Sequence, residues 1–433
     1  MLSVQATPPQ KMGGTFWAVY DAVLAACLLL ASSGAFSQMG GLTVFWGLTY
    51  LLFTLRVLAV FPQFVNLCLR HRILFSFAAV ALLSTFWSLD RTETLISAIQ
   101  LLASTCFAVF LGSRYSAKAL VTFLFLMASA QVLVSMANFA TGALPVPGSD
   151  SFGRAIGIFH HKKPLTMQAV LCVLCGIGLF LVPGQSNVVR LFVVFMALIC
   201  AWAAAMAQSV SLIVISMPAI MLLLVLSYRS IYRLPFFFAL ALGLVILAIA
   251  PIFVPLLGLN LPDIFFDATG KDISLTGRTV LWEIGLSEIA QRPILGSGFA
   301  AFLTADPFVN ERAIFERMYI EVPAFHNFLV DIAVGTGVPG VIAILVVVYT
   351  VIRSTATSWS IFRSPYSAVV TTIAVFVVLV SNVTTGFATQ HDLNYILAIA
   401  LAVSAREDVR HLPHALRPRV YEDQGTVLVD ATP

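Results

Sequence analysis

The amino-acid sequence predicts an all-α polytopic membrane protein with about 12 transmembrane helices and one large loop between the ninth and tenth. Of its 433 residues, 60% are hydrophobic and only 10% are charged, against about 45–50% and about 25% in ordinary soluble domains. The mean hydropathy is +0.97. The apolar stretches are repeatedly about 20 residues long, which is the length of helix that crosses about 30 Å of hydrocarbon. These values exclude a soluble enzyme, a disordered chain and a fibrous protein.

The apolar stretches define the predicted spans in chain order. A membrane β-barrel would alternate apolar and polar residues in segments of about ten, and this chain does not. Two connections are long, and the chain divides accordingly into 1–257 with nine helices, the loop 258–326, 327–405 with three helices, and a polar cytoplasmic tail at 406–433. The predicted spans are 15–36, 42–61, 73–89, 94–112, 119–140, 165–183, 191–207, 210–227, 234–257, 327–351, 366–384 and 392–405.

Orientation follows from the distribution of lysine and arginine, because short cytoplasmic loops carry an excess of both. With the N-terminus in the cytoplasm, 14 of these residues lie inside, and the short external loops hold 4. Five more lie in 258–326, where the rule has little force because long loops translocate largely regardless of charge. We therefore expect both termini in the cytoplasm and both long loops, 141–164 and 258–326, outside.

Two charged residues fall inside predicted spans. Asp21 lies near the cytoplasmic start of the first helix, and Arg56 lies about one turn from the cytoplasmic end of the second. Charges within a membrane are functional candidates by default. Each can also reach the interface, or the two can pair, and this structural interpretation is favoured.

The middle of the large loop, TGRTVLWEIGLSEIAQRP from Thr276 to Pro293, has apolar residues at roughly helical spacing. It predicts an amphipathic helix at the membrane surface, with Trp282 at the interface. Arg278 would lie in the first turn, where the helix N-terminus attracts anions and a guanidinium can bind phosphate through two parallel hydrogen bonds. Arg278 is therefore a candidate phosphate ligand, the alternative being a solvated surface arginine.

The loop ends at His326 and Asn327, where the tenth span begins with HNFLVDIAVGTGVPG. A histidine side chain changes charge near neutral pH and can accept a proton from a hydroxyl. Gly337 and Gly340 follow on the same helix and are expected to allow close helix packing. His326 is thus a candidate catalytic base on a rigid element, although a lone interfacial histidine is more often structural.

The smaller external loop contains a basic segment, GRAIGIFHHKKP, from Gly153 to Pro164. The large loop has a net charge of −4, from five cations and nine anions. Any anion bound there must be held by specific arginines, with help from the cations Arg154, Lys162 and Lys163 of the basic segment. The alternative role of the two lysines is to anchor lipid headgroups.

No metal site or cofactor is expected. His160 and His161 are adjacent and therefore do not share a helix face, and neither external loop has an H-x-x-x-H or paired-carboxylate pattern. No Gly-rich phosphate loop is present, so ATP is not implied, and nothing points to nucleic acid.

Three motifs resemble the O-antigen ligase and polysaccharide polymerase superfamily. The first is H-N, nine residues, then G-x-x-G, at His326, Asn327, Gly337 and Gly340. The other two are G-R-x-x-L-W followed by P-x-L-G-x-G-F within 277–299, and G-I-F-x-H-K within 157–162. They lie in order in the expected loops, and twelve helices with the main loop after the ninth also fit the family.

The resemblance implies a metal-independent, inverting glycosyltransferase of the bacterial inner membrane that acts at the periplasmic face. His326 would activate the acceptor hydroxyl. Arg278, Arg154, His161, Lys162 and Asn327 would bind the undecaprenyl-diphosphate-linked oligosaccharide. Besides the lipid bilayer, a chain-length regulator is a candidate partner.

The chain departs from the family at the start of the eighth helix. Many members carry a basic residue after a serine there, whereas this chain reads Gln208-Ser209-Val210-Ser211. Either part of the diphosphate site is missing, or Arg154 and Lys162 substitute for the cation.

The motifs leave the acceptor open. An exopolysaccharide polymerase of the succinoglycan type is favoured over a ligase that transfers O-antigen to lipid A core. A secondary transporter is disfavoured because no internal repeat is visible and the unusual residues cluster at one surface. A SEDS-type cell-wall polymerase lacks its motifs here, and a non-catalytic export subunit would tolerate loss of His326.

Overall fold

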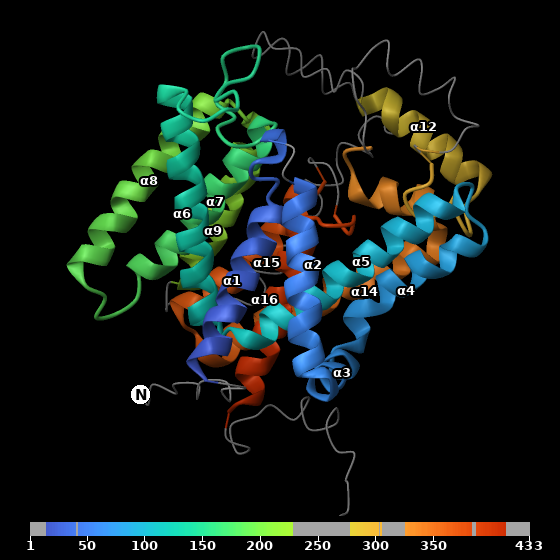
Figure 1. Ribbon diagram of the computed structural model, residues 1–433, viewed down its shortest axis with the longest axis horizontal. Coiled ribbons are helices and arrows are strands. Elements are labelled where there is room, and N and C mark those ends of the chain that lie inside the picture. Colours follow the sequence, from blue (N-terminus) through green and yellow to red (C-terminus); the bar gives the residue numbers. More distant parts are fainter. Residues whose placement is uncertain are drawn as a thin grey trace, which may run out of the picture.

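The computed structural model describes residues 14–39, 42–227, 278–302, 304, 325–382 and 387–412. Within these residues the regular secondary structure is helical, apart from an isolated bridge between Ser149 and Ala155. Seven of the described helices are long and apolar enough to cross a membrane, or eight if the bent pair Phe61–Arg70 and Arg72–Phe86 is one span. The chain is an all-α multi-pass membrane protein (Figure 1).

Every predicted span that falls on described residues overlaps a helix or a helical segment, and the helix at the predicted span 327–351 continues to Phe362. The predicted span 234–257 and the middle of the predicted large loop lie outside the described residues. The span predicted at 73–89 is a helical segment, Arg72–Phe86, that meets the preceding helix at 84°. The helices are α1 (Thr15–Ser32), α2 (Leu42–Ala59), α3 (Phe61–Arg70), α4 (Ser76–Leu83), α5 (Arg91–Arg114), α6 (Ala117–Thr141), α7 (Lys162–Phe180), α8 (Asn187–Ala207), α9 (Val210–Ser227), α12 (Arg278–Gln291), α14 (Phe328–Phe362), α15 (Pro365–Val380) and α16 (Leu393–Arg410).

Side-chain caps fix where several helices begin. Asp90 accepts a hydrogen bond from the amide of Glu93 at the start of α5, and Asp392 accepts one from Tyr395 at the start of α16. Ser364 forms a capping box with Ser367 before α15. Such caps satisfy amides that have no partner inside the helix, so the polar residue before each apolar run determines the boundary.

Helix α16 continues beyond its predicted end at 405, to Arg410. The extra turn is held by contacts with other segments. Glu407 accepts hydrogen bonds from Arg70 (3.1 Å) and pairs with His71 (3.0 Å), and Asp408 accepts one from the amide of Ala117 (2.8 Å). The residues predicted to begin the tail therefore join three helical segments, while 413–433 lie outside the described residues.

The core runs through α7, α15 and α16, whose residues are mostly buried. By contrast, α2 and α8 expose large apolar side chains, among them Val44, Leu51, Leu58, Leu191 and Leu198. Apolar side chains facing outward along whole helices suit contact with lipid. The peripheral helices thus surround a buried central layer.

Both candidate external segments lie at one end of the bundle. Figure 1 shows the loop between α6 and α7 and the helix α12 at the end opposite the label N. The turn between α1 and α2 joins this end, because the amide of Phe36 donates to the carbonyl of Ile158 (2.9 Å) and Gln38 donates to the carbonyl of Phe159. The fold therefore gathers the motif-bearing segments at a common end.

Candidate functional site

His326 lies in a short turn before α14, in the left-handed region with φ +54°. This backbone conformation costs about 1–2 kcal/mol for a residue that has a Cβ. The residue before it is fixed on both sides: the Phe325 carbonyl accepts a hydrogen bond from Trp282 Nε1 (2.9 Å), and the Phe325 amide donates to Asp331 (2.9 Å). The turn is thus stabilised against relaxation, and it holds the half-buried His326 ring in one place.

Asn327 fixes the other side of the turn. Its side chain is buried, and its oxygen caps α14 by accepting hydrogen bonds from the amides of Leu329 (3.0 Å) and Val330 (3.3 Å). The side-chain oxygen of Asn327 is therefore engaged with the helix start. In this arrangement Asn327 positions His326, its neighbour.

Helix α12 packs against this turn through Trp282. The side chain of Trp282, predicted to lie at the membrane interface, is buried in an apolar cluster of the protein. Its indole N–H needs a partner when buried, and the Phe325 carbonyl supplies one. Gly285 of the same helix faces the turn, since a Cβ there would lie 2.7 Å from Val330 Cγ1. The cluster comprises Leu281, Trp282, Phe302, Phe325, Val330 and Val334.

Helix α14 is interrupted at Gly337, which has the non-helical angles φ +60° and ψ −155°. In an unbroken helix the carbonyl of Val334 would accept from the amide of residue 338, and that of Gly335 from residue 339. Residue 339 is a proline and has no amide hydrogen. The sequence G-V-P-G therefore leaves two buried carbonyls and one amide without helical partners.

The segment after α12 supplies these partners. The amides of Ser297 and Gly298 donate to the carbonyls of Val334 and Gly335 (2.8 Å each), and the amide of Val338 donates to the carbonyl of Ile294 (3.2 Å). The P-x-L-G-x-G-F motif thus docks on the break made by the G-x-x-G motif. Two motifs separated in the sequence form one structural unit.

This docking corrects the role predicted for the glycines. A Cβ at Gly337 would lie 2.2 Å from the carbonyl oxygen of Ile294, whereas at Gly340 it would meet Thr336 of its own helix. The close approach is therefore between α14 and the 293–299 segment, and not between two helices. Glycine is required at Gly337 by both its backbone angles and the adjacent chain.

The other side of the 293–299 segment forms hydrogen bonds with residues that precede α5. Trp87 donates to the carbonyl of Leu295 (2.7 Å), and the amide of Phe299 donates to Ser84 Oγ (3.0 Å). Glu288 of α12 is buried and accepts from Ser297 Oγ and Arg292. The segment therefore joins α12, α14 and the turn before α5.

The basic segment is organised by α6. Asn138 donates to the carbonyls of Val146 and Gly157 (3.2 Å each) and accepts from the amide of Leu144. Gly157 has φ +65°, and a Cβ there would lie 2.2 Å from Ser135 Cβ. The first glycine of the G-I-F-x-H-K motif thus allows the loop to lie directly on α6.

Arg154 is paired within its own loop. Its Nε donates to Asp150 at 2.6 Å, and its guanidinium lies 4.6 Å from the ring centroid of Phe152. Burial acts to raise the pKa of Asp150, but hydrogen bonds to Arg154 and Phe152 outweigh it and lower that pKa. Part of the Arg154 charge is therefore offset by a carboxylate beside it.

His161 caps α7 through Nδ1, which accepts from the amide of Lys163 (3.2 Å). A cap of this kind requires an unprotonated Nδ1. Partial burial, followed by the charges of Lys163, His160, Lys162 and Arg154, lowers the pKa of His161 to about 4. The ring is therefore neutral near pH 7, and its proton is on Nε2.

Lys162 contacts the turn before α9, next to the position where this chain lacks the cation of the family pattern. Its Nζ donates to the carbonyl of Gln208 (3.3 Å), which ends α8 in the left-handed conformation with φ +51°. The amide of Ala155 donates to the carbonyl of Met206 in the same turn (3.0 Å). The basic segment is thus laid against the residues that precede α9.

Arg278 is the first residue of α12, as predicted, but its side chain and the preceding Gly277 lie outside what the structure describes. Sequence reasoning missed three positioning residues: Asp331, Glu288 and Ser297. Asp331 could have been suspected, because it is an acidic residue in the first turn of the helix that follows His326. The partners of the other two depend on a segment distant in sequence.

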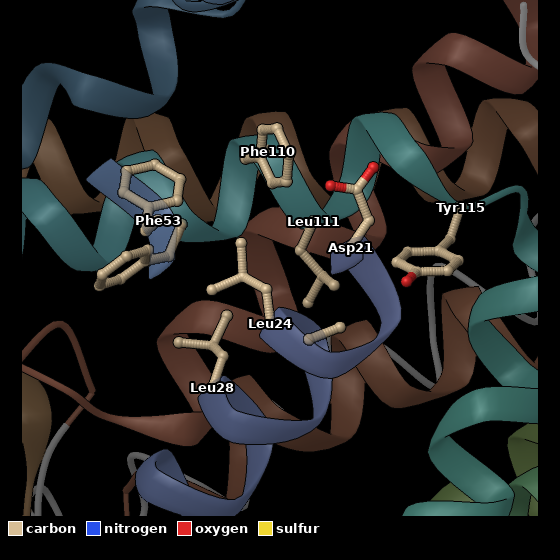
Figure 2. Close-up of a pocket in the computed structure, with 9 residues that line it drawn as sticks. Asp21, Leu24, Leu28, Phe53, Phe110, Leu111 and Tyr115 are labelled. Atoms are coloured by element: carbon tan, nitrogen blue, oxygen red, sulfur yellow. The ribbon is translucent and has the colours of Figure 1, made fainter. Parts of the chain in front are cut away.

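The charges within predicted spans form a separate cluster. Arg56 donates to Asp21 at 2.7 Å, with side chains only 1% and 5% exposed, and Arg114 of α5 binds the same carboxylate at 2.8 Å. The pairing of Asp21 with Arg56 is as expected, and Arg114 adds to it. Figure 2 shows Asp21 and Tyr115 at one end of a mostly apolar pocket, with Leu28 and Phe53 towards the other. This pocket lies on other elements than those that carry His326 and Lys162.

Among the described residues, no group of three or more His, Cys, Asp or Glu is arranged to hold a metal ion. What the end of the bundle carries is a fixed histidine turn and a basic segment. Together these provide a proton acceptor and groups that can bind an anion.

Comparison with known proteins gives two matches. A family model described as O-Antigen ligase matches residues 191–345. The Exopolysaccharide production protein ExoQ of Rhizobium meliloti (strain 1021) is 26% identical over 284 residues, covering 64% of this chain and 63% of that protein. The chain thus spans less than two thirds of that relative's length.

The region matched by the family model contains α12, the His326 turn, the docked 293–299 segment and the break in α14. These are the elements in which the sequence motifs meet. The sequence motifs and the sequence similarity agree: this chain resembles the O-antigen ligase and polysaccharide polymerase superfamily.

Proposed function

We propose that this protein polymerises exopolysaccharide repeat units by transferring glycan from an undecaprenyl-diphosphate-linked oligosaccharide at the periplasmic face of the inner membrane. The observation that carries the proposal is the His326 turn. A polar, half-buried histidine is held in a left-handed conformation by its two neighbours, at the end of a membrane helix. Strain of this kind persists only where the surroundings over-determine it, and it concentrates at functional sites.

In this mechanism His326 takes the proton of the acceptor hydroxyl as that oxygen attacks the anomeric carbon of the donor sugar. The new bond from oxygen to carbon forms on the face opposite the breaking bond to the diphosphate. Undecaprenyl diphosphate leaves with both electrons of that bond, and the anomeric configuration inverts. General base assistance of this type is worth about 10²–10⁴-fold.

The leaving diphosphate needs cationic or hydrogen-bonding partners as its charge develops. Arg278 at the start of α12 and Lys162 beside Gln208 are the residues proposed for this role. The neutral His161 adds a hydrogen bond donor. Arg154, already paired with Asp150, is assigned the weaker contribution. In this proposal Lys162 replaces the cation that family members carry at the start of α9 and that this chain lacks.

The proposal includes the finer topology: about 12 spans, cytoplasmic termini, and loops 141–164 and 258–326 in the periplasm. It is supported by the bias of lysine and arginine towards one side of the short loops. Contacts between predicted cytoplasmic segments agree with it. Arg70 donates a hydrogen bond to Glu407, and the amide of Ala117 donates one to Asp408.

A ligase that transfers the same glycan to lipid A core is the second candidate, favoured by the description of the matching family. The similarity to an exopolysaccharide production protein favours the polymerase.

One experiment distinguishes the polymerase from the ligase. Purified protein in nanodiscs is given the lipid-linked oligosaccharide that accumulates in cells lacking this chain, with or without lipid A core. A ladder of lengthened glycan without lipid A core supports the polymerase. Transfer that requires lipid A core supports the ligase, and no transfer under either condition contradicts both.

A further inference from the structure

A further histidine lies at the same end of the bundle, in the 387–392 segment between α15 and α16. His391 stacks on Trp46 of α2, with ring centroids 3.8 Å apart and planes inclined by 16°. Its Nε2 is 2.7 Å from the hydroxyl of Tyr50, and its backbone amide donates to Ser104 Oγ (3.1 Å). Two helices, α2 and α5, thus contribute the contacts that fix this partly exposed residue.

The backbone around His391 is strained. Ala388 and His391 both have positive φ, at +61° and +66°. The left-handed backbone conformation costs about 1–2 kcal/mol for each residue that has a Cβ. The stacking and the two hydrogen bonds offset this cost, so the position of the ring is built by the surrounding structure and not by local preference.

The segment is connected to the His326 turn. Phe387 packs against Phe328, two residues after His326, with ring centroids 5.2 Å apart, and against Tyr395 at 5.8 Å. The start of α2, which carries Trp46, follows the turn that binds the basic segment through Phe36 and Gln38. The His391 segment is therefore linked by packing to the His326 turn, and through α2 to the turn that binds the basic segment.

The chemistry of the ring favours a neutral ligand. Burial lowers the pKa of His391 to about 4, so the ring is uncharged near pH 7 and offers no charge to a diphosphate. Tyr50 occupies Nε2, and no described residue makes a hydrogen bond to Nδ1. Whichever nitrogen carries the proton, Nδ1 can bind a sugar hydroxyl, because a hydroxyl both donates and accepts.

We propose that His391 is a saccharide-binding residue whose Nδ1 forms a hydrogen bond with a hydroxyl of the glycan. This inference rests on the proposed function, and it adds a glycan contact on the α2 side of His326. Tyr50 and Trp46 are positioning residues, because they act by holding the His391 ring.

Two substitutions separate the nitrogens of the ring. Asparagine at this position can place its amide near the site of Nδ1, and it tolerates positive φ. Glutamine places its amide near Nε2 and can keep the contact with Tyr50. We therefore expect His391→Asn to retain glycan binding and His391→Gln to lose it. The matched control is His411→Ala, at the opposite end of the same helix α16.

The probe is the free oligosaccharide released by mild acid from the accumulated lipid-linked intermediate, which contains no diphosphate. Calorimetry with purified protein in nanodiscs should show His391→Gln and His391→Ala weakening binding by about threefold to tenfold, the range expected for one neutral hydrogen bond. His391→Asn and His411→Ala should bind like the wild type. In the transfer assay KM should rise in proportion, while kcat changes by less than about threefold.

Equal affinity of the wild type and His391→Gln would overturn the inference. So would a parallel loss of thermal stability and affinity in all His391 variants, since that outcome indicates a structural role. If binding depends on His391 but the wild type transfers no glycan, the proposed function fails and the binding residue stands. If transfer depends on His326 and binding ignores His391, the reverse holds.

Discussion

The backbone amide of Ser297 donates a hydrogen bond to the carbonyl oxygen of Val334 at 2.8 Å, and this contact joins two motifs that lie more than 30 residues apart. The carbonyl is available because Gly337 interrupts α14 and Pro339 has no amide hydrogen. The interruption by itself would destabilise the fold, since a buried carbonyl without a hydrogen-bond partner lowers the free energy of unfolding by about 1–3 kcal/mol. The segment after α12 satisfies it, and so fixes α12 next to the His326 turn.

This relationship predicts that Gly337→Ala destabilises the protein by at least about 1–3 kcal/mol, because the new Cβ meets both a left-handed φ and the Ile294 carbonyl. Thermal unfolding in detergent measures the effect. Gly47→Ala in α2 is the matched control, since no heavy atom lies within 4 Å of a Cβ there. Equal melting temperatures for the two variants would contradict the docking.

His326→Ala should lower glycan transfer by about 10²–10⁴-fold, because the acceptor hydroxyl loses its base. Protein level and membrane insertion should stay unchanged, and His326→Gln should retain traces if positioning contributes as much as basicity. Transfer from the lipid-linked oligosaccharide, followed on gels, is the measurement. EDTA should have no effect on the wild type. Undiminished turnover by His326→Ala would eliminate this base, and chelator-sensitive turnover would indicate metal-assisted chemistry.

Arg278→Ala should weaken binding of the lipid diphosphate, and Arg278→Lys should restore it only in part. A lysine supplies charge but not the two parallel hydrogen bonds of a guanidinium. Binding of undecaprenyl diphosphate to nanodisc protein tests this, with Arg292→Lys at the other end of α12 as the control. Full rescue by lysine would show that Arg278 contributes charge alone.

Asp21→Asn should destabilise the protein by about 3–5 kcal/mol, because it leaves the buried Arg56 and Arg114 without a counter-charge. The comparison is Asp150→Asn, whose pair with Arg154 is 21% and 26% exposed and is worth at most about 1 kcal/mol. Both are measured by thermal unfolding in detergent. A loss no larger than that of Asp150→Asn would show that the buried cluster is not a stabilising element.

Topology reporters fused after residue 150 or 300 should report periplasm, and after 230 or 410 should report cytoplasm. The reason is the excess of lysine and arginine on one side of the short loops. Alkaline phosphatase and fluorescent-protein fusions provide the paired readout. A periplasmic result at 230 would reject both the topology and the proposed location of the site.

The sequence by itself determined the helical membrane architecture and most helix boundaries. Hydrophobic length is a local property, and a capping residue such as Asp90 or Asp392 acts within one turn of its helix. His326 could also be selected as a candidate from the sequence, because a polar turn meets an apolar span at that residue. The motif resemblance then indicated the family that the comparisons also find.

The tertiary structure decided how these pieces are used. Trp282 was expected at the membrane interface, but its partner is the Phe325 carbonyl. Lys162 was one of two proposed substitutes for a missing cation, and its ammonium reaches Gln208. No periodicity carries this information, because each contact depends on how distant backbone segments approach one another. A broken helix exposes hydrogen-bonding groups whose partners can come from anywhere in the chain, and only folding selects which segment supplies them.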